Sequence, residues 1–249
     1  MSIVWFNGKF AGGAIPLDSR DRGFLLGDGV FETVAVRDHR PMWLAEHLAR
    51  MEASALELGI IFDAEIIGAG VAAVLERSWT GFEALRVTLS RGSAMRGLAS
   101  ACVAPSLLVT LDALNPSGLP QSASLKVASI RRNEHAPSSR LKTLSYIDGI
   151  AAAREVAGEA DDALMLNTAG HVASTTIANI FMLRGNELIT PGLDQGILPG
   201  ITRRKLLDSA RKISLTPVER AVRLEEIFDA DSVFTCNSLR FARPVARLD

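Results

Sequence analysis

The sequence has few of the features that mark a metal centre, a disulfide framework or a membrane segment. Its two cysteines, Cys102 and Cys236, are far apart and match no metal or redox spacing, so we expect free thiols in a reducing cytoplasm. The four histidines are scattered and have no paired carboxylates around them, which argues against a structural metal. No uncharged apolar run is long enough for a transmembrane helix, and we expect no signal peptide.

A strong excess of one charge is also missing. The formal net charge is −1, which argues against a nucleic acid or a membrane surface as a partner held by bulk electrostatics. Apolar residues make up 48% and charged residues 22% of the chain, a composition typical of a globular protein with a sizeable core. The 249 residues suffice for one large domain or two smaller ones.

The first half of the chain reads as strands and helices followed by a linker. Asn7-Gly8 separates two short strand-like runs and predicts a tight hairpin turn. The segment 115–120 is rich in proline, glycine and serine, so we expect an N-terminal α/β domain over 1–114 and a linker over 115–122. In this half we expect the hairpin 3–10, strands at 30–36, 84–90 and 106–114, and helices at 44–58 and 64–77.

The remaining residues, 123–249, are expected to form a second domain. Glycine-containing turns separate its short apolar runs, which is typical of antiparallel strand pairs. In this half we expect strands at 124–130, 162–166, 171–174, 180–183, 187–190 and 232–236, a helix at 147–157, and a helix that begins near residue 201.

Lys142 is the centre of the functional hypothesis. It lies within the stretch Ser138 to Tyr146, and Leu141 and Leu144 are its apolar neighbours. A lysine held near apolar side chains can lose its proton, because burial disfavours the ammonium, and it can then form a Schiff base with a carbonyl. On this stretch alone, a surface lysine that reaches into water is the alternative.

Two glycine-containing loops are candidates for anion binding. The segment 91–97 contains Arg96, whose guanidinium could bind a carboxylate, although a solvated loop fits the same residues. The segment 196–202 runs into a helix, where free backbone N–H groups favour a phosphate and Thr202 adds a hydroxyl. An aldehyde-binding lysine, a phosphate site and a carboxylate-binding arginine together point to pyridoxal 5'-phosphate as the cofactor.

A series of motifs over nearly the whole chain supports this hypothesis. The motifs are Asp21-Arg22-Gly23-Phe24, Gly27 to Thr33, His47 to Arg50, Ser90 to Gly92 with Arg96-Gly97, Leu141 to Tyr146, Asn179 to Phe181, Leu198 to Arg203, and Pro244-Val245. In this order they resemble the class IV pyridoxal-phosphate enzymes. That family includes branched-chain aminotransferases, D-amino-acid aminotransferases and 4-amino-4-deoxychorismate lyases.

The resemblance implies roles for individual residues. Lys142 corresponds to the Schiff-base lysine, which also moves a proton between the substrate Cα and the cofactor. Tyr146 lies near the position of a tyrosine that bonds the ring hydroxyl of the cofactor in some members. The groups that correspond to phosphate donors are Arg50, Ile201, Thr202 and Ser238.

The resemblance also implies a substrate site, a fold and an assembly. Arg96 lies where D-amino-acid enzymes and lyases carry a carboxylate-binding arginine, and we expect Phe31 and Leu239 to contact the substrate. The implied fold is α/β (α+β) of the D-amino-acid-aminotransferase type, fold type IV. It has a small N-terminal α/β domain and a larger barrel-like C-terminal domain that binds the cofactor in the cleft between them. The implied active unit is a homodimer.

Three positions depart from the family pattern. Ser174 stands where most members have a glutamate that pairs with the pyridine nitrogen of the cofactor. Ala35 replaces a common arginine, and Leu26 stands where branched-chain enzymes have a tyrosine. A hydroxyl at position 174 carries no charge, so it gives the ring nitrogen no charge-based reason to be protonated.

We therefore predict an aminotransferase that moves an amino group between an amino acid, of branched-chain or D-amino-acid type, and a 2-oxo acid. The first alternative is a 4-amino-4-deoxychorismate lyase that releases 4-aminobenzoate and pyruvate. The second is a catalytically weak protein that only binds pyridoxal phosphate. The retained lysine and phosphate groups argue against the second alternative.

Overall fold

The computed structural model describes residues 2–79, 81–101, 104–114 and 122–249, which form two compact units. One unit contains 1–118 together with 142–145, and the other contains 119–141 and 146–249. Apart from Ser122, the expected linker 115–122 lies outside the described residues, as does Cys102, so the linker and the domain boundary stay predictions.

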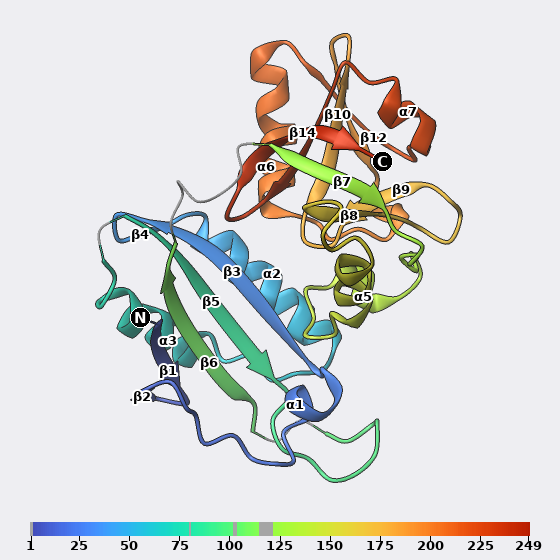
Figure 1. Cartoon of the computed structure of the whole chain (residues 1–249). Helices are drawn as coiled ribbons and strands as arrows, with labels where there is room; N and C mark the ends of the chain where they lie inside the picture. The colour runs from blue at the N-terminus through green and yellow to red at the C-terminus, as the bar shows by residue number, and fades with distance from the viewer. Residues whose placement is uncertain (1, 80, 102–103, 115–121) are drawn as a thin grey trace. The chain divides into compact units, whose positions relative to one another are not determined.

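The first unit is built on a six-stranded antiparallel sheet with the strand order β2-β1-β6-β5-β3-β4. In Figure 1 the helices α2 and α3 lie on one face of this sheet. The strands are β1 Ser2–Phe6, β2 Lys9–Ala11, β3 Gly29–Arg37, β4 Arg40–Pro41, β5 Phe82–Ser90 and β6 Ser106–Ala113, and the helices are α1 Arg22–Leu26, α2 Leu44–Glu57 and α3 Ala64–Leu75.

Alternating side chains of the sheet form the core of this unit. In β5 every second residue is buried, including Leu85 and Val87, as expected for a strand with one face against helices. Met51 of α2 and Ile67 of α3 belong to the same apolar cluster. The Asp63 side chain caps the start of α3 by accepting hydrogen bonds from two backbone amides.

The second unit contains a mixed eight-stranded sheet with the order β12-β11-β10-β13-β14-β7-β8-β9. Since β9, at one end of this order, also packs against β10 and β11, the sheet curls on itself. Its strands are β7 Ala123–Val127, β8 Asp162–Leu166, β9 Val172–Thr175, β10 Asn179–Arg184, β11 Glu187–Pro191, β12 Thr216–Arg220, β13 Ser232–Asn237 and β14 Phe241–Leu248.

Short helices cover parts of this curled sheet. One apolar cluster joins Leu207 of the helix α6 to Phe181 of β10 and to the buried free thiol of Cys236, and Phe181 stacks on Phe234 at a centroid distance of 5.2 Å. The helices are α4 Pro137–Arg140, α5 Ile147–Glu155, α6 Ile201–Ala210 and α7 Leu224–Phe228, with 3-10 turns η2 Leu193–Gln195 and η3 Arg211–Ile213.

The structure confirms the expected mixed α/β fold and the long periodic elements. The predicted strand 30–36 lies within β3, and the predicted helices 44–58 and 64–77 correspond to α2 and α3. Asn7 and Gly8 both have positive φ angles, of 43° and 90°, as a tight hairpin turn requires. Among the described residues, no helix is both long and apolar enough to cross a membrane.

Candidate active site

Lys142 is held by main-chain pairing with β3. The amide of Phe31 donates to the carbonyl of Lys142 at 3.0 Å, and the amide of Leu144 donates to the carbonyl of Gly29 at 2.9 Å. An antiparallel bridge between Val30 and Thr143 lies between these two bonds. Residues 142–145 therefore form a short strand-like extension of the first unit, and the backbone of β3 fixes the lysine.

The Lys142 ammonium is buried beside an aromatic ring and near charges of both signs. Its Nζ atom lies 4.3 Å from the centroid of the Phe31 ring. Burial lowers the pKa of the ammonium to about 8, and the positive charges of Arg50 and Arg86 act in the same direction. The negative charge of Glu32 opposes this shift. The sequence-based expectation of a lysine that can lose its proton thus has a physical basis in the structure.

Glu32 is the centre of a buried charge cluster beside this lysine. Its carboxylate accepts hydrogen bonds from Nε and Nη2 of Arg50, both at 2.7 Å, and lies 2.7 Å from Nδ1 of His47. Glu32 and His47 are fully buried. Burial alone would raise the pKa of the Glu32 carboxyl, but the contacts with His47 and Arg50 outweigh it and lower that pKa. The cluster therefore contains a carboxylate anion that fixes the Arg50 guanidinium through two bonds.

The cluster joins Arg50, a site residue predicted from the sequence, to Glu32, which was not predicted. Arg50 remains a predicted phosphate donor, and its guanidinium orientation is set by Glu32. Phe31, predicted to contact the substrate, is itself buried, and its ring also contacts Arg86, whose Cζ atom lies 3.8 Å from the ring centroid.

The second unit presents a helix N-terminus with an unpartnered hydroxyl. Helix α6 begins after Gly200, which provides no side-chain cap. Thr202 is 4% exposed, and among the described residues no group bonds its hydroxyl oxygen. A buried hydroxyl without a partner is costly in a folded protein, so its presence next to free amide groups fits an anion such as phosphate.

Gly200 is required at this position by a close approach of Asn179. A Cβ atom at residue 200 would lie 2.2 Å from Oδ1 of Asn179. Asn179 in turn donates to the carbonyl of Leu198 at 3.0 Å, so the loop before α6 is fixed against the start of β10. The glycine loop identified in the sequence is therefore shaped by packing within the second unit.

Ser238 and Leu239 lie in the turn after β13, at the same end of the sheet as Asn179. Asn179 pairs with Cys236 in the antiparallel register of β10 and β13. The Asn237 side chain accepts hydrogen bonds from the amides of Leu239 (3.1 Å) and of the following residue (2.9 Å), which fixes this turn. The structure thus brings the predicted residues Ile201, Thr202 and Ser238 to one end of the curled sheet.

Ser174 lies in β9 and is buried. Its hydroxyl donates to the carbonyl of Thr175 at 2.9 Å, so it supplies no negative charge to its surroundings. In the antiparallel pairing of β8 and β9, Ser174 lies opposite Met165. The Sδ atom of Met165 lies 3.4 Å from Nη2 of Arg132. No described group bonds the buried Nε of Arg132, and burial lowers the pKa of its guanidinium. Tyr146 is the residue that precedes the first turn of α5.

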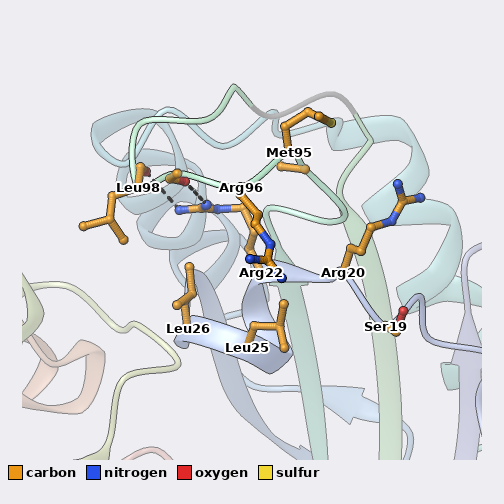
Figure 2. A pocket seen from close by; sticks show the side chains of 10 residues that line it. Ser19, Arg20, Arg22, Leu25, Leu26, Met95, Arg96 and Leu98 are labelled. Atoms are coloured by element: carbon orange, nitrogen blue, oxygen red, sulfur yellow. Dashed lines mark hydrogen bonds between the residues drawn. The ribbon is translucent and has the colours of Figure 1, made fainter.

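Arg96 lies in the exposed loop after β5 and borders a cavity of about 720 Å³ within the first unit. Figure 2 shows its side chain directed from the loop toward α1, which carries Leu25 and Leu26. The residues that line the cavity are Ser19, Arg20, Arg22, Leu25, Leu26, Ala94, Met95, Arg96, Gly97 and Leu98.

The site residues predicted from the sequence are thus divided between the two units. The first contains Lys142, Arg50, Phe31 and Arg96, and the second contains the remaining predicted residues. Sequence reasoning missed Glu32 and Arg132, although the position of Glu32 within a matching motif was a usable signal. Across the described ranges, no three His, Cys, Asp or Glu side chains are grouped to hold a metal ion.

Comparison with known proteins gives a consistent result. Residues 29–248 match the family model for amino-transferase class IV. A curated relative, the aminodeoxychorismate lyase of Bacillus subtilis, is 31% identical over 99% of this chain and 87% of its own length. A probable branched-chain-amino-acid aminotransferase of Thermotoga maritima is 28% identical over the same shares.

Two solved structures that resemble this chain bear the same two kinds of name. The 4-amino-4-deoxychorismate lyase of Pseudomonas aeruginosa superposes with a TM-score of 0.86 at 30% identity, covering 99% of this chain and 92% of that one. A hypothetical aminotransferase of Mycobacterium tuberculosis in a form with bound pyridoxal phosphate has a TM-score of 0.87 at 27% identity, with coverage of 99% and 91%.

Proposed function

Because the chain belongs to the amino-transferase class IV family, we propose that it uses pyridoxal 5'-phosphate to move an amino group between an amino acid and a 2-oxo acid. The observation that carries this proposal is the buried ammonium of Lys142, whose pKa is lowered to about 8. The neutral amine is therefore far more populated near neutral pH than in an ordinary lysine, whose pKa is ~10.4. A neutral amine is the form that attaches to the cofactor and that accepts a proton from the substrate Cα.

The donor set of the second unit fits the phosphate of that cofactor. The amides of Ile201 and Thr202, the unpartnered Thr202 hydroxyl and the Ser238 hydroxyl would hold it. Arg50 would add a charge-assisted bond, with its orientation fixed by Glu32. When bound, pyridoxal phosphate supplies an aldehyde that joins to amines and a ring that withdraws electrons.

Other residues of the chain act on the substrate and on the cofactor ring. Arg96 would bind a substrate carboxylate, while Phe31 and Leu239 would limit the space for its side chain. Tyr146 would contact the ring hydroxyl and Ser174 the ring nitrogen. Lys142 would move a proton from the substrate Cα to the cofactor in the first half of the exchange, and a proton back to the Cα of the new amino acid in the second half.

A 4-amino-4-deoxychorismate lyase is the second candidate function. It is favoured by the names of the relative at 31% identity and of the solved structure at 30% identity. Both reactions need Lys142 and the phosphate donors, so the residues described above do not distinguish them.

The family resemblance also supports a homodimer in the cytoplasm. Size-exclusion chromatography with multi-angle light scattering would test the assembly.

A half-reaction screen tests the proposed function. Purified enzyme with bound cofactor is mixed with single L- and D-amino acids while absorbance reports conversion to the pyridoxamine form. An aminotransferase converts stoichiometrically with at least one donor. Conversion with none, together with pyruvate release from aminodeoxychorismate, would refute the aminotransferase and favour the lyase. The Lys142→Ala variant is the control that should do neither.

A further inference from the structure

The Arg96 loop, defined here as residues 91–98, is fixed at its start by the two consecutive residues Asp21 and Arg22. The Asp21 carboxylate accepts a hydrogen bond from the hydroxyl of Ser90 at 2.7 Å, and Asp21 forms an isolated bridge with Ser93. The amide of Arg22 donates to the carbonyl of Gly92 at 2.9 Å. Asp21 is only 1% exposed, so water competes little for these bonds.

The side chain of Arg22 fixes the other end of the same loop. Its Nη1 atom donates to the carbonyl of Gly97 at 2.6 Å and its Nη2 atom donates to the carbonyl of Leu98 at 3.0 Å, as the dashed lines in Figure 2 show. Its Nε atom donates to the carboxylate of Asp28 at 2.7 Å. Arg22 is 6% exposed, and all three of its guanidinium nitrogens are used in the protein itself. It is therefore occupied with the loop and is not available to a ligand.

A second arginine makes the position of Arg22 rigid. Asp28 also accepts a 2.7 Å bond from Nε of Arg91, whose Nη atoms donate to the carbonyls of Leu58 (2.6 Å) and Gly59 (2.8 Å) just after α2. Burial would raise the pKa of the Asp28 carboxyl, but the bonds from Arg91 and Arg22 outweigh it, and the net shift is downward. Asp28 thus remains an anion that connects the end of the loop to the helical layer of the first unit.

Arg96 lies between these two fixed ends. It is exposed, and within the part of the chain that the structure describes no group accepts a bond from its guanidinium. The same cavity is lined by the side chains of Leu25, Leu26, Met95 and Leu98, all of which are more than half exposed. One arginine without a partner beside apolar side chains suits an organic anion with an apolar body, such as a carboxylate on a hydrocarbon chain or ring.

We propose that Arg22 is a positioning residue: it holds the Arg96 loop at Gly97 and Leu98 so that Arg96 meets the carboxylate of the substrate. This inference rests on the proposed function, because it assigns the anion bound by Arg96 to the substrate of that reaction. Arg22 acts only through Arg96, so its removal changes substrate binding and leaves the cofactor and the proton chemistry of Lys142 in place.

The test uses Arg22→Lys in the full-length enzyme with bound cofactor. Lysine keeps the charge, but a single ammonium cannot reach the Asp28 carboxylate and both carbonyls. We expect amide hydrogen exchange over residues 95–100 to become about tenfold faster and KM for the carboxylate substrate to rise about 3- to 10-fold, with kcat and cofactor content unchanged. The matched control is Arg243→Lys, because Arg243 is 5% exposed and bonds a carbonyl and the carboxylate of Asp161 in the second unit. Arg243→Lys should change neither the hydrogen exchange over residues 95–100 nor KM.

A double-mutant comparison separates positioning from a merely structural role. Arg96→Ala should raise KM about tenfold or more, as the loss of one charge-assisted contact does. If Arg22 acts through Arg96, then Arg22→Lys adds no further rise of KM in the Arg96→Ala background. An equal rise in both backgrounds would overturn the proposal, and so would unchanged exchange over residues 95–100 in the single variant.

The test of Arg22 gives an answer that does not depend on whether the enzyme is an aminotransferase or a lyase. If the enzyme proves to be the lyase, KM is measured with aminodeoxychorismate, which also carries carboxylates, and the same coupling is expected. If Arg96→Ala leaves KM unchanged for the substrate that the enzyme turns over, the link between Arg22 and substrate binding is refuted, whichever reaction the enzyme catalyses.

Discussion

Replacing Glu32 by glutamine should destabilise the first unit and change the titration of Lys142. The Glu32 carboxylate is fully buried and has three contacts of 2.7 Å with His47 and Arg50. Glutamine is similar in shape but neutral, so the guanidinium of Arg50 would lose its counter-ion in a buried place. Breaking one partner of such a pair costs about 3–5 kcal/mol, which is a large part of a typical unfolding free energy of about 5–15 kcal/mol.

The expected loss is measurable as a melting temperature. For a chain of this size, a change of 1 kcal/mol shifts Tm by about 2–4 °C, so we expect Glu32→Gln to melt about 6–20 °C below wild type. The matched control is Glu83→Gln. Glu83 is a buried glutamate whose hydrogen-bond donors among the described residues are neutral, namely the Ser78 hydroxyl and the Trp79 amide at 3.1 Å. Its replacement should therefore cost less, about 1–3 kcal/mol.

The second readout is the pKa of Lys142 in cofactor-free protein, followed by mass spectrometry of reductive methylation against pH. Wild type should show a midpoint near the pKa of about 8. Because the Glu32 anion stabilises the ammonium, Glu32→Gln should move the midpoint to lower pH, whereas Glu83→Gln should leave it unchanged. A Glu32→Gln variant with the wild-type Tm and midpoint would refute this account of the cluster.

Three further predictions concern the residues expected at the cofactor. Lys142→Ala should abolish turnover and leave Tm within a few degrees of wild type. Borohydride reduction of the wild type, followed by peptide mapping, should place the pyridoxyl group on Lys142. An adduct on another lysine would contradict the assignment. Thr202→Val removes the unpartnered hydroxyl at constant shape, so apoprotein should bind pyridoxal phosphate about tenfold more weakly by fluorescence titration, while unchanged affinity would exclude Thr202 as a phosphate donor. Ser174→Glu should protonate the ring nitrogen of bound cofactor and speed the half-reaction; a nitrogen-15 shift typical of pyridinium in wild type would contradict the idea that a neutral residue leaves the ring unprotonated.

The strands and helices that the sequence predicted correctly are those with a clear period. The alternation in β5 and the helical spacing in α2 depend on local residues alone, so they could be read without tertiary information. The short helix α1 was missed because its five residues contain a glycine and adjacent leucines, and its cap depends on the Asp21 side chain. The strands β12 and β14 were missed because each contains a proline and lies among charged residues.

The candidate site was predictable where residue type determines chemistry. Lys142, Arg96 and Thr202 could be proposed from the sequence because few residue types can hold an aldehyde, a carboxylate or a phosphate. Glu32 was not identified, because its role depends on His47 and Arg50, which are distant in sequence and meet it only through the packing of α2 on β3. Arg132 was missed for a related reason: a buried guanidinium cannot be told from a solvated one by sequence.

The pairing of residues 142–145 with β3 has an evolutionary consequence. The lysine takes its position from two backbone bonds to Phe31 and Gly29, so the chain before residue 142 and after residue 145 does not set it. Insertions or deletions in those flanking segments should therefore leave the reactive amine where it is, provided that the paired residues are kept. A lineage of such proteins can therefore change the length of these connections while the proposed attachment point of the cofactor, Lys142, stays in place.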